Sequence, residues 1–176
     1  MEHFLLAIIP SEDIVIKIRD LRKSVFKNLG LISSLCLPVM IPVAFLEESI
    51  NKDLFSDIQL TTPLTTSNDI LIEEQNIFLG IKNIDIIEKI VESLNLSIKK
   101  GFISTGRGFY LGTNENNLNS EEILTYLAHN SEKILVWRKN NLKLIKIITE
   151  NEIWWENIRW ETIWNQKIKL KNNYFL

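Results

Sequence analysis

The sequence is poor in the residues that metal sites and nucleophilic sites require. Among its 176 residues there are one cysteine and two histidines. Cys36 forms no internal disulfide, which favours a reducing compartment, and its neighbours Leu35 and Leu37 supply no base, so we interpret it as an inert, buried thiol. His3 and His129 lie far from it and from each other, and these side chains do not have the spacing of a zinc site. We therefore expect neither a metal nor another cofactor.

Long apolar segments and targeting signals are also missing. The uncharged stretch between Lys27 and Glu47 falls just short of the roughly 20 apolar residues of a membrane helix, and it contains Pro38 and Pro42. Residues 1–10 are apolar but carry no basic segment, and acidic residues follow at once, unlike in a signal peptide. We predict no membrane span and a cytoplasmic protein.

Other catalytic patterns are lacking too. Gly106-Arg107-Gly108 is followed by an apolar strand pattern, whereas a phosphate-binding glycine loop opens a helix. Adjacent acidic residues such as Glu47-Glu48 and Glu73-Glu74 point to different sides of a helix or strand, so we interpret them as solvated surface.

Charge is modest and unevenly distributed. The net charge is −2, with 45% hydrophobic and 24% charged residues, which is ordinary for a globular protein and argues against binding driven by bulk basicity. Residues 133–176 carry nine Lys or Arg and four Glu, about +5, which leaves about −7 for the rest of the chain. A basic end of this kind either contacts phosphates or is a solvated surface. The frequent Ile, Asn and Lys favour an AT-rich, bacterial genome.

The first 46 residues predict a strand, a helix and a second strand. Residues 3–9 form a short apolar run that ends at Pro10 and suits a buried strand. Ser11 is a suitable N-cap for a helix whose apolar stripe is Ile14, Ile18, Leu21 and Val25, and Gly30 is a natural stop. A strand over residues 39–46 completes this first unit, 3–46.

The same order returns in residues 76–113. Residues 76–81 predict a strand and residues 107–113 another. Between them Ile87, Val91, Leu94 and Ile98 form a helical stripe that Gly101 ends. The two units indicate a weak internal duplication, with two lobes about a pseudo-twofold axis in one domain, 1–176.

The remaining segments predict further strands and one helix. Residues 51–75 read as irregular strands and loops, with a turn in the Thr-rich stretch 61–66. Asn119, with Glu122 three residues on, predicts the start of a helix that runs through Ala128. The C-terminal strands occupy about 134–171, and within them the stretch Lys139-Asn140-Asn141 predicts a hairpin turn.

Four of the five tryptophans lie between residues 154 and 164. In a strand, Trp160 and Trp164 would share one face, and in a helix they would lie four residues apart, so periodicity does not decide between the two. Their rings either pack in the core, stack on a base or ligand, or form a surface for a protein partner through Trp154 and Trp155.

Several apolar segments resemble strands of one enzyme family. These are Phe4-Leu5-Leu6-Ala7-Ile8-Ile9-Pro10, Ile41-Pro42-Val43-Ala44-Phe45-Leu46, Ile77-Phe78-Leu79-Gly80-Ile81 and Phe109-Tyr110-Leu111-Gly112. Their pattern and order are similar to those of the two-histidine (2H) phosphoesterases, which include bacterial RNA 2′,3′-cyclic phosphodiesterases and 2′-5′ RNA ligase-like proteins. The resemblance implies an α+β fold of two lobes, with antiparallel sheets around a central cleft.

The catalytic residues of that family do not match. Its members carry two His-x-Thr/Ser motifs, in which one histidine acts as general base, the other as general acid, and the hydroxyls hold the phosphate. Aligned on the apolar strands, the first histidine and hydroxyl positions hold Met40 and Pro42, and the second pair holds Gly108 and Tyr110. The resemblance therefore implies a cleft lined by these four residues and Arg107, with no catalytic residue.

Three functions remain open from the sequence. The first is a catalytically inactive 2H phosphoesterase-like protein whose cleft binds a nucleotide or RNA, with Arg107 and Tyr110 against a phosphate or base. The second is an enzyme of another class that uses the same cleft. The third is a protein-interaction module with a Trp-rich C-terminal surface.

Overall fold

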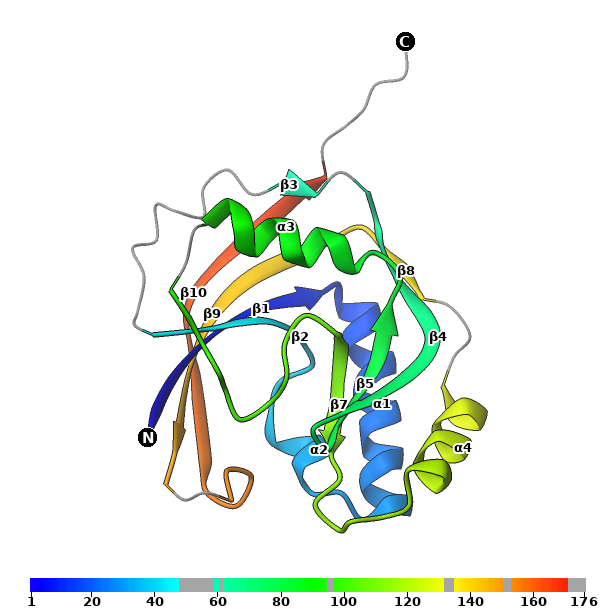
Figure 1. Ribbon diagram of the computed structural model, residues 1–176. Coiled ribbons are helices and arrows are strands. Elements are labelled where there is room, and N and C mark those ends of the chain that lie inside the picture. Colours follow the sequence, from blue (N-terminus) through cyan, green and yellow to red (C-terminus); the bar gives the residue numbers. More distant parts are fainter. Residues whose placement is uncertain (48–58, 61, 95–96, 132–134, 151–152, 171–176) are drawn as a thin grey trace.

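The computed structural model describes residues 1–47, 59–60, 62–94, 97–131, 135–150 and 153–170, and it is an α+β fold with two sheets (Figure 1). Every strand pairing is antiparallel except that between β10 and β3. The larger sheet has the order β3 (Gln59–Leu60), β10 (Ile158–Leu170), β9 (Asn140–Thr149), β1 (Glu2–Pro10), β2 (Ile41–Leu46), β6 (Ile98–Lys99). The smaller sheet has the order β7 (Gly108–Thr113), β5 (Asn76–Ile81), β4 (Leu64–Glu73), β8 (Val136–Trp137).

The first predicted unit is present. Helix α1 (Glu12–Leu29) follows β1, and its buried side chains include the four of the predicted apolar stripe. Gly30 ends the helix in the left-handed conformation, with φ of 71°, and its N–H donates to Phe26 O at 2.9 Å. The short helix α2 (Ser33–Cys36) then leads into β2, which pairs with β1.

The second unit is present with one difference. Helix α3 (Ile84–Leu94) lies between β5 and β7, which pair with each other as β1 and β2 do. Ile98 does not continue the helical stripe as predicted, because it lies in β6 and pairs with β2. The same apolar residue type suits an edge strand and a helix face, so spacing alone did not separate the two.

One prediction was incomplete and another was wrong. Within the segment predicted as irregular strands and loops, residues 64–73 form the ten-residue strand β4, whose pairing with β5 is irregular between Thr66 and Ile70. Residues 51–58 and 61 of that segment lie outside the described residues. The hairpin predicted around residues 139–141 does not form, because β8 pairs with β4 whereas β9 pairs with β1 and β10. The stretch connects β8 of the smaller sheet to β9 of the larger sheet. Residues that favour a turn do not show which strands the segments on either side of it will pair with. Helix α4 (Ser120–Asn130) is as predicted, and the Asn119 side chain accepts from Glu121 N at 2.9 Å.

Two of the tryptophans, Trp160 and Trp164, lie in β10, whereas Trp154 and Trp155 lie in the turn before it. Trp160 lies opposite Ile147, and Trp164 lies opposite Leu144, with a register shift between Thr162 and Trp164. The extra residue turns the two tryptophans to opposite faces of the sheet, whereas a regular strand would place them on one face.

The buried side chains form two clusters on opposite faces of the strands. The outer core lies between the helices and the sheets, and it contains Leu6 and Ile8 of β1. The inner cluster takes the alternate residues and contains no residue of α1, α3 or α4. It consists of Leu5, Ala7, Leu37, Met40, Phe45, Phe78, Ile103, Tyr110, Ile145, Ile147 and Trp154.

Candidate functional site

The fold brings together the two segments in which the family motifs would lie. Tyr110 N donates to Met40 O at 3.3 Å, and Gly106 N donates to Pro42 O at 2.8 Å. Met40, Pro42, Gly108 and Tyr110 are therefore neighbours, although they come from opposite lobes of the chain. All four are buried.

Apolar side chains fill the space at these positions. Met40 and Tyr110 are fully buried in the inner cluster. The Tyr110 ring meets Phe78 edge to face at 5.9 Å between centroids, and it contacts Trp154 at 6.1 Å. An apolar, filled cluster of this kind counts against an enzyme of another class at the same place, because such an enzyme needs polar groups that converge on a reacting atom.

Tyr110 is held by a buried hydrogen-bonded chain. Its hydroxyl lies 2.8 Å from Thr113 Oγ1, which donates to Asn76 Oδ1 at 3.0 Å. Since the Thr113 hydroxyl gives its proton to Asn76, the Tyr110 hydroxyl is the donor in the first of these bonds. Burial raises the pKa of Tyr110 above its ordinary value of 10. This phenol therefore keeps its proton and is engaged in the core.

The backbone at Gly108 has no room for a side chain. A Cβ there would lie 2.1 Å from Leu79 O and 2.9 Å from Gly80 Cα. Both atoms belong to the neighbouring strand β5, so they can move only with the strand. A histidine in the second motif position is incompatible with the observed pairing of β5 and β7.

Arg107 lies beside these positions but is engaged by a carboxylate. Its Nε donates to Glu73 Oε2 at 2.5 Å and its Nη2 donates to Glu73 Oε1 at 2.8 Å. These bonds raise the pKa of Arg107, and its side chain is 46% exposed. Arg107, Lys99 and Lys100 line a surface hollow of about 200 Å³ together with Glu73, Glu74, Ser104 and Thr105.

Sequence reasoning missed a buried arginine next to the same region. Arg22 is 2% exposed, and it donates to the carbonyl oxygens of Ser34 and, at 2.6 Å, Leu37. Burial lowers its pKa to about 10. The signal was present, because Arg22 stands four residues after Ile18 and three before Val25, on the apolar face of the predicted helix.

Arg22 and Glu115 hold the two ends of α2. The Glu115 carboxylate accepts from Ile32 N and Ser33 N at the N-terminus, where a negative charge is favourable. The Arg22 guanidinium meets the carbonyls at the C-terminus. Because Ser33 also exchanges hydrogen bonds with the backbone of Thr113, this arrangement fixes the chain that precedes Met40 against β7.

The two histidines and the cysteine lie in unrelated places. His3 packs against the rings of Phe45 and Phe102, and burial, followed by Lys99 and the N-terminal amine, lowers its pKa. His129 is exposed in the last turn of α4 and pairs with Thr125 O at 2.8 Å. Burial raises the pKa of Cys36.

In the described part of the chain, no three His, Cys, Asp or Glu side chains are arranged to hold a metal ion. No helix within the same residues is long and apolar enough to cross a membrane.

The tryptophans predicted as a partner surface are partly core. Trp154 is 5% exposed and lies 4.7 Å from the Phe102 ring centroid, whereas Trp155 is half-buried. Trp160 is exposed and donates to Cys36 O at 3.2 Å. Trp154 is therefore not available to a partner in this fold.

Comparison with known proteins supports the architecture. No protein-family model matches the chain, and no curated protein matches it in sequence. Among solved structures it is similar to E. coli LigT complexed with 3′-AMP, a 2H phosphoesterase, with a TM-score of 0.52. The chain has a 2H phosphoesterase-like fold. The likeness covers 96% of this chain and 98% of LigT at 12% identity, so it establishes the fold alone.

Proposed function

We propose that this 2H phosphoesterase-like protein is catalytically inactive and binds a nucleotide or an RNA end without hydrolysing it. The observation that carries the proposal is the composition of the two motif positions. They lie together, and Met40 and Gly108 stand where general acid–base catalysis would need two imidazoles.

The buried groups at these positions support the loss of hydrolysis. A thioether does not titrate, and the Tyr110 phenol has a raised pKa and donates its proton within the core. The lack of space beside Leu79 O also opposes a histidine at position 108. Neither His3 nor His129 lies in a motif strand at a matching position, so neither replaces the missing imidazoles.

The hollow at Arg107 supports the retention of binding. It joins Arg107, Lys99 and Lys100 to the hydroxyl-bearing residues Ser104 and Thr105. Arg107 is paired with Glu73 and Lys100 with Glu74, so an anion in the hollow competes with these two carboxylates. A phosphate that displaces Glu73 would meet the guanidinium through two parallel hydrogen bonds. The structure of LigT with 3′-AMP is further support, since it shows that a protein of this fold accommodates a nucleotide.

The test combines binding with turnover. The purified chain is titrated with 2′,3′-cyclic nucleotides and short RNAs while its thermal unfolding is followed, and each mixture is checked for hydrolysis. A ligand at about 100 times its Kd stabilises the folded state by about 2.7 kcal/mol, which is a visible shift. We expect a shift without product.

The matched variants are Arg107→Ala and Lys89→Ala, because each removes one cation that pairs with a carboxylate. We expect Arg107→Ala to weaken binding by about tenfold, equivalent to about 1.4 kcal/mol, and Lys89→Ala to leave it unchanged. Binding that Arg107→Ala does not weaken would place the ligand elsewhere, and product formation would overturn the loss of catalysis.

A further inference from the structure

Strand β10 lies at one side of the larger sheet, and its outer edge is largely uncovered. It pairs with β9 from Ile158 to Ile168, whereas on its other side β3 pairs with it only at Lys169 and Leu170. Within the described residues, no strand covers this outer edge over residues 158–168. The backbone N–H and C=O groups of such an edge are able to pair with another chain.

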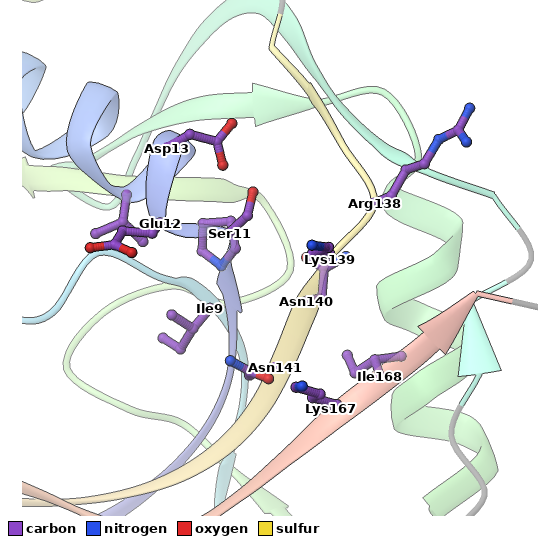
Figure 2. A pocket seen from close by; sticks show the side chains of 12 residues that line it. Ile9, Ser11, Glu12, Asp13, Arg138, Lys139, Asn140, Asn141, Lys167 and Ile168 are labelled. Carbon is purple, nitrogen blue, oxygen red and sulfur yellow. The ribbon is translucent and has the colours of Figure 1, made fainter.

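The second half of this edge carries features that hinder such pairing. A register shift between Thr162 and Trp164 makes the strand irregular, and Lys167 brings a charge to it. Lys167 and Ile168 also line a cavity of about 860 Å³ at the end of the strand that β3 joins (Figure 2). The first half, Ile158–Thr162, pairs regularly with β9 and contains neither lysine nor proline, so it is the part left open to a partner strand.

The open segment Ile158–Thr162 is complementary to a second copy of itself. When two identical strands pair antiparallel about a twofold axis, the axis passes through one residue, which lies opposite its own copy. With the axis at Trp160, Arg159 of each copy lies opposite Glu161 of the other, and the two tryptophans meet. Opposite charges and aromatic rings at directly opposite positions stabilise the pairing of two strands.

Neighbouring registers are less favourable. An axis at Arg159 places two guanidinium groups opposite each other, and an axis at Glu161 does the same with two carboxylates. Like charges at directly opposite positions are destabilising. An axis at Ile158 or Thr162 brings no opposite charges together. The charges of the open segment therefore favour one register, with the axis at Trp160.

The side chains of the open segment are accessible to a partner. Four of them are exposed, namely Arg159, Trp160, Glu161 and Thr162. Trp160 is 44% exposed, and its ring is on the inner face of the sheet because it lies opposite Ile147. Its Nε1 donates to Cys36 O, and Leu35, the residue before Cys36, is itself 46% exposed. A second indole beside Trp160 covers apolar surface that a single copy leaves in contact with water.

Arg159 and Glu161 lie on the outer face and keep the capacity to bond a partner. Arg159 Nη2 donates to Glu150 Oε1 at 2.6 Å, but the Arg159 side chain is 76% exposed and a guanidinium has further N–H donors. Glu161 lies opposite Lys146, whose Nζ pairs with Glu2 Oε1 at 2.7 Å. Each of the two charges can therefore add a bond across a dimer while it stays in contact with water.

We propose that this protein forms a homodimer in which the open segments of two copies pair antiparallel about a twofold axis at Trp160. The pairing joins the two larger sheets into one. Because the open segment is five residues long and stable interfaces bury about 1,200–2,000 Å², the dimer is weak and forms reversibly as the concentration rises. The inference does not rest on the proposed function, since no residue of the open segment lines the hollow at Arg107.

The first experiment is sedimentation velocity over about a hundredfold range of protein concentration. We expect the wild type to pass from monomer toward dimer. Arg159→Glu and Glu161→Arg each place like charges opposite each other, so each should raise the dimer Kd by about tenfold or more. The double variant Arg159→Glu/Glu161→Arg restores opposite charges across the dimer and should return the Kd to within about threefold of the wild type.

The double variant separates the dimer contact from contacts within one copy. In it, position 159 still repels Glu150 and position 161 still repels Lys146, so a role confined to one copy predicts no recovery. Lys89→Glu is the matched control, because it reverses an exposed, ion-paired cation on α3 and should leave the Kd within about twofold. A wild type that stays monomeric throughout, or a double variant as monomeric as the single variants, would overturn the proposal.

A second measurement uses the wild type alone and holds even if the charge variants fail to fold. In ¹H–¹⁵N spectra, the backbone amides of residues 158–162 should shift as the concentration rises, and their hydrogen exchange should slow. A dimer that leaves these amides unmoved has its interface elsewhere and contradicts the inference. A monomeric wild type whose amides at 158–162 respond only to an added extended peptide of unrelated sequence would make the edge a peptide site and overturn the homodimer.

Discussion

At the scale of single residues, buried polar side chains hold the segments around the motif positions in place through hydrogen bonds. Tyr110, Thr113 and Asn76 form one hydrogen-bonded chain, and Arg22 donates to the carbonyl oxygens of Ser34 and Leu37. Each group satisfies a neighbour that would otherwise be buried without a partner. These polar residues therefore stabilise the position of β7 and α2.

Replacing Arg22 with methionine tests this role. Arg22→Met fills a similar volume but leaves Ser34 O and Leu37 O without their donor. We expect the free energy of unfolding to fall by about 1–3 kcal/mol in urea titrations. Arg19→Met, at an exposed position of the same helix, should change it by less than about 0.5 kcal/mol. A variant at position 22 as stable as the wild type would contradict the role.

His3 should make stability depend on pH. Burial lowers its pKa in the folded state, so below its ordinary value of 6.5 the unfolded chain binds more protons than the folded chain. The stability contributed by this group is present above about pH 6.5 and is lost as the pH falls through the lower, folded-state pKa. We expect His3→Gln to lose less stability than the wild type when the pH falls from about 7.5 to about 5.

The measurement is thermal unfolding at both pH values, with His129→Gln as the control that removes the other histidine from its exposed helix turn. An identical loss in the wild type and His3→Gln would show that His3 is not responsible.

Some of these residues were within reach of sequence reasoning and others were not. Arg22 could have been found, since it interrupts an apolar helical stripe. The buried hydrogen bond from Trp137 Nε1 to Asn140 Oδ1 could not, because it depends on how β8 and β9 separate into different sheets.

At the scale of elements, apolar runs predicted where strands lie better than how they pair. Short apolar runs match the strands β1, β5 and β7, and the first of these runs ends at Pro10. A helical stripe between Ser11 and Gly30 matches helix α1. The extent of strand β4 was not predicted because part of the strand is polar. The pairing of β8 with β4 was not predicted because it depends on contacts between distant segments. The register shift in β10 has no sequence signal that we recognise, yet it decides which face Trp164 occupies.

Trp154 should act as a core residue of the segment between β9 and β10. Trp154→Ala removes a ring that contacts Phe102 and Tyr110, so we expect the free energy of unfolding to fall by about 3–5 kcal/mol. Trp160→Ala removes a partly exposed ring and one hydrogen bond, and it should cost about 1 kcal/mol. Chemical denaturation measures both. If Trp154→Ala leaves the free energy of unfolding nearly unchanged, Trp154 is not a core residue and is again a candidate for a partner surface.

At the scale of the whole molecule, the 2H phosphoesterase-like architecture is kept while its inner face is apolar at the motif positions. Two units with matching strand–helix–strand order bring Met40 and Tyr110 together, since Tyr110 N donates to Met40 O. The polar hollow at Arg107 lies at the edge of this packed centre, since Phe45 and Ile103 of the inner cluster line it as well. This arrangement of a packed centre with a polar hollow at its edge is the basis of the proposed binding without hydrolysis.

The most direct test of this account is an assay for phosphodiester hydrolysis. The purified chain is incubated with 2′,3′-cyclic nucleotides and a 2′-5′-linked dinucleotide near neutral pH, beside an active 2H phosphoesterase as the positive control. The account predicts no product above the buffer background, since no imidazole stands at either motif position. Product that increases in proportion to the protein, saturates with substrate and follows the chain through a second purification step would contradict it.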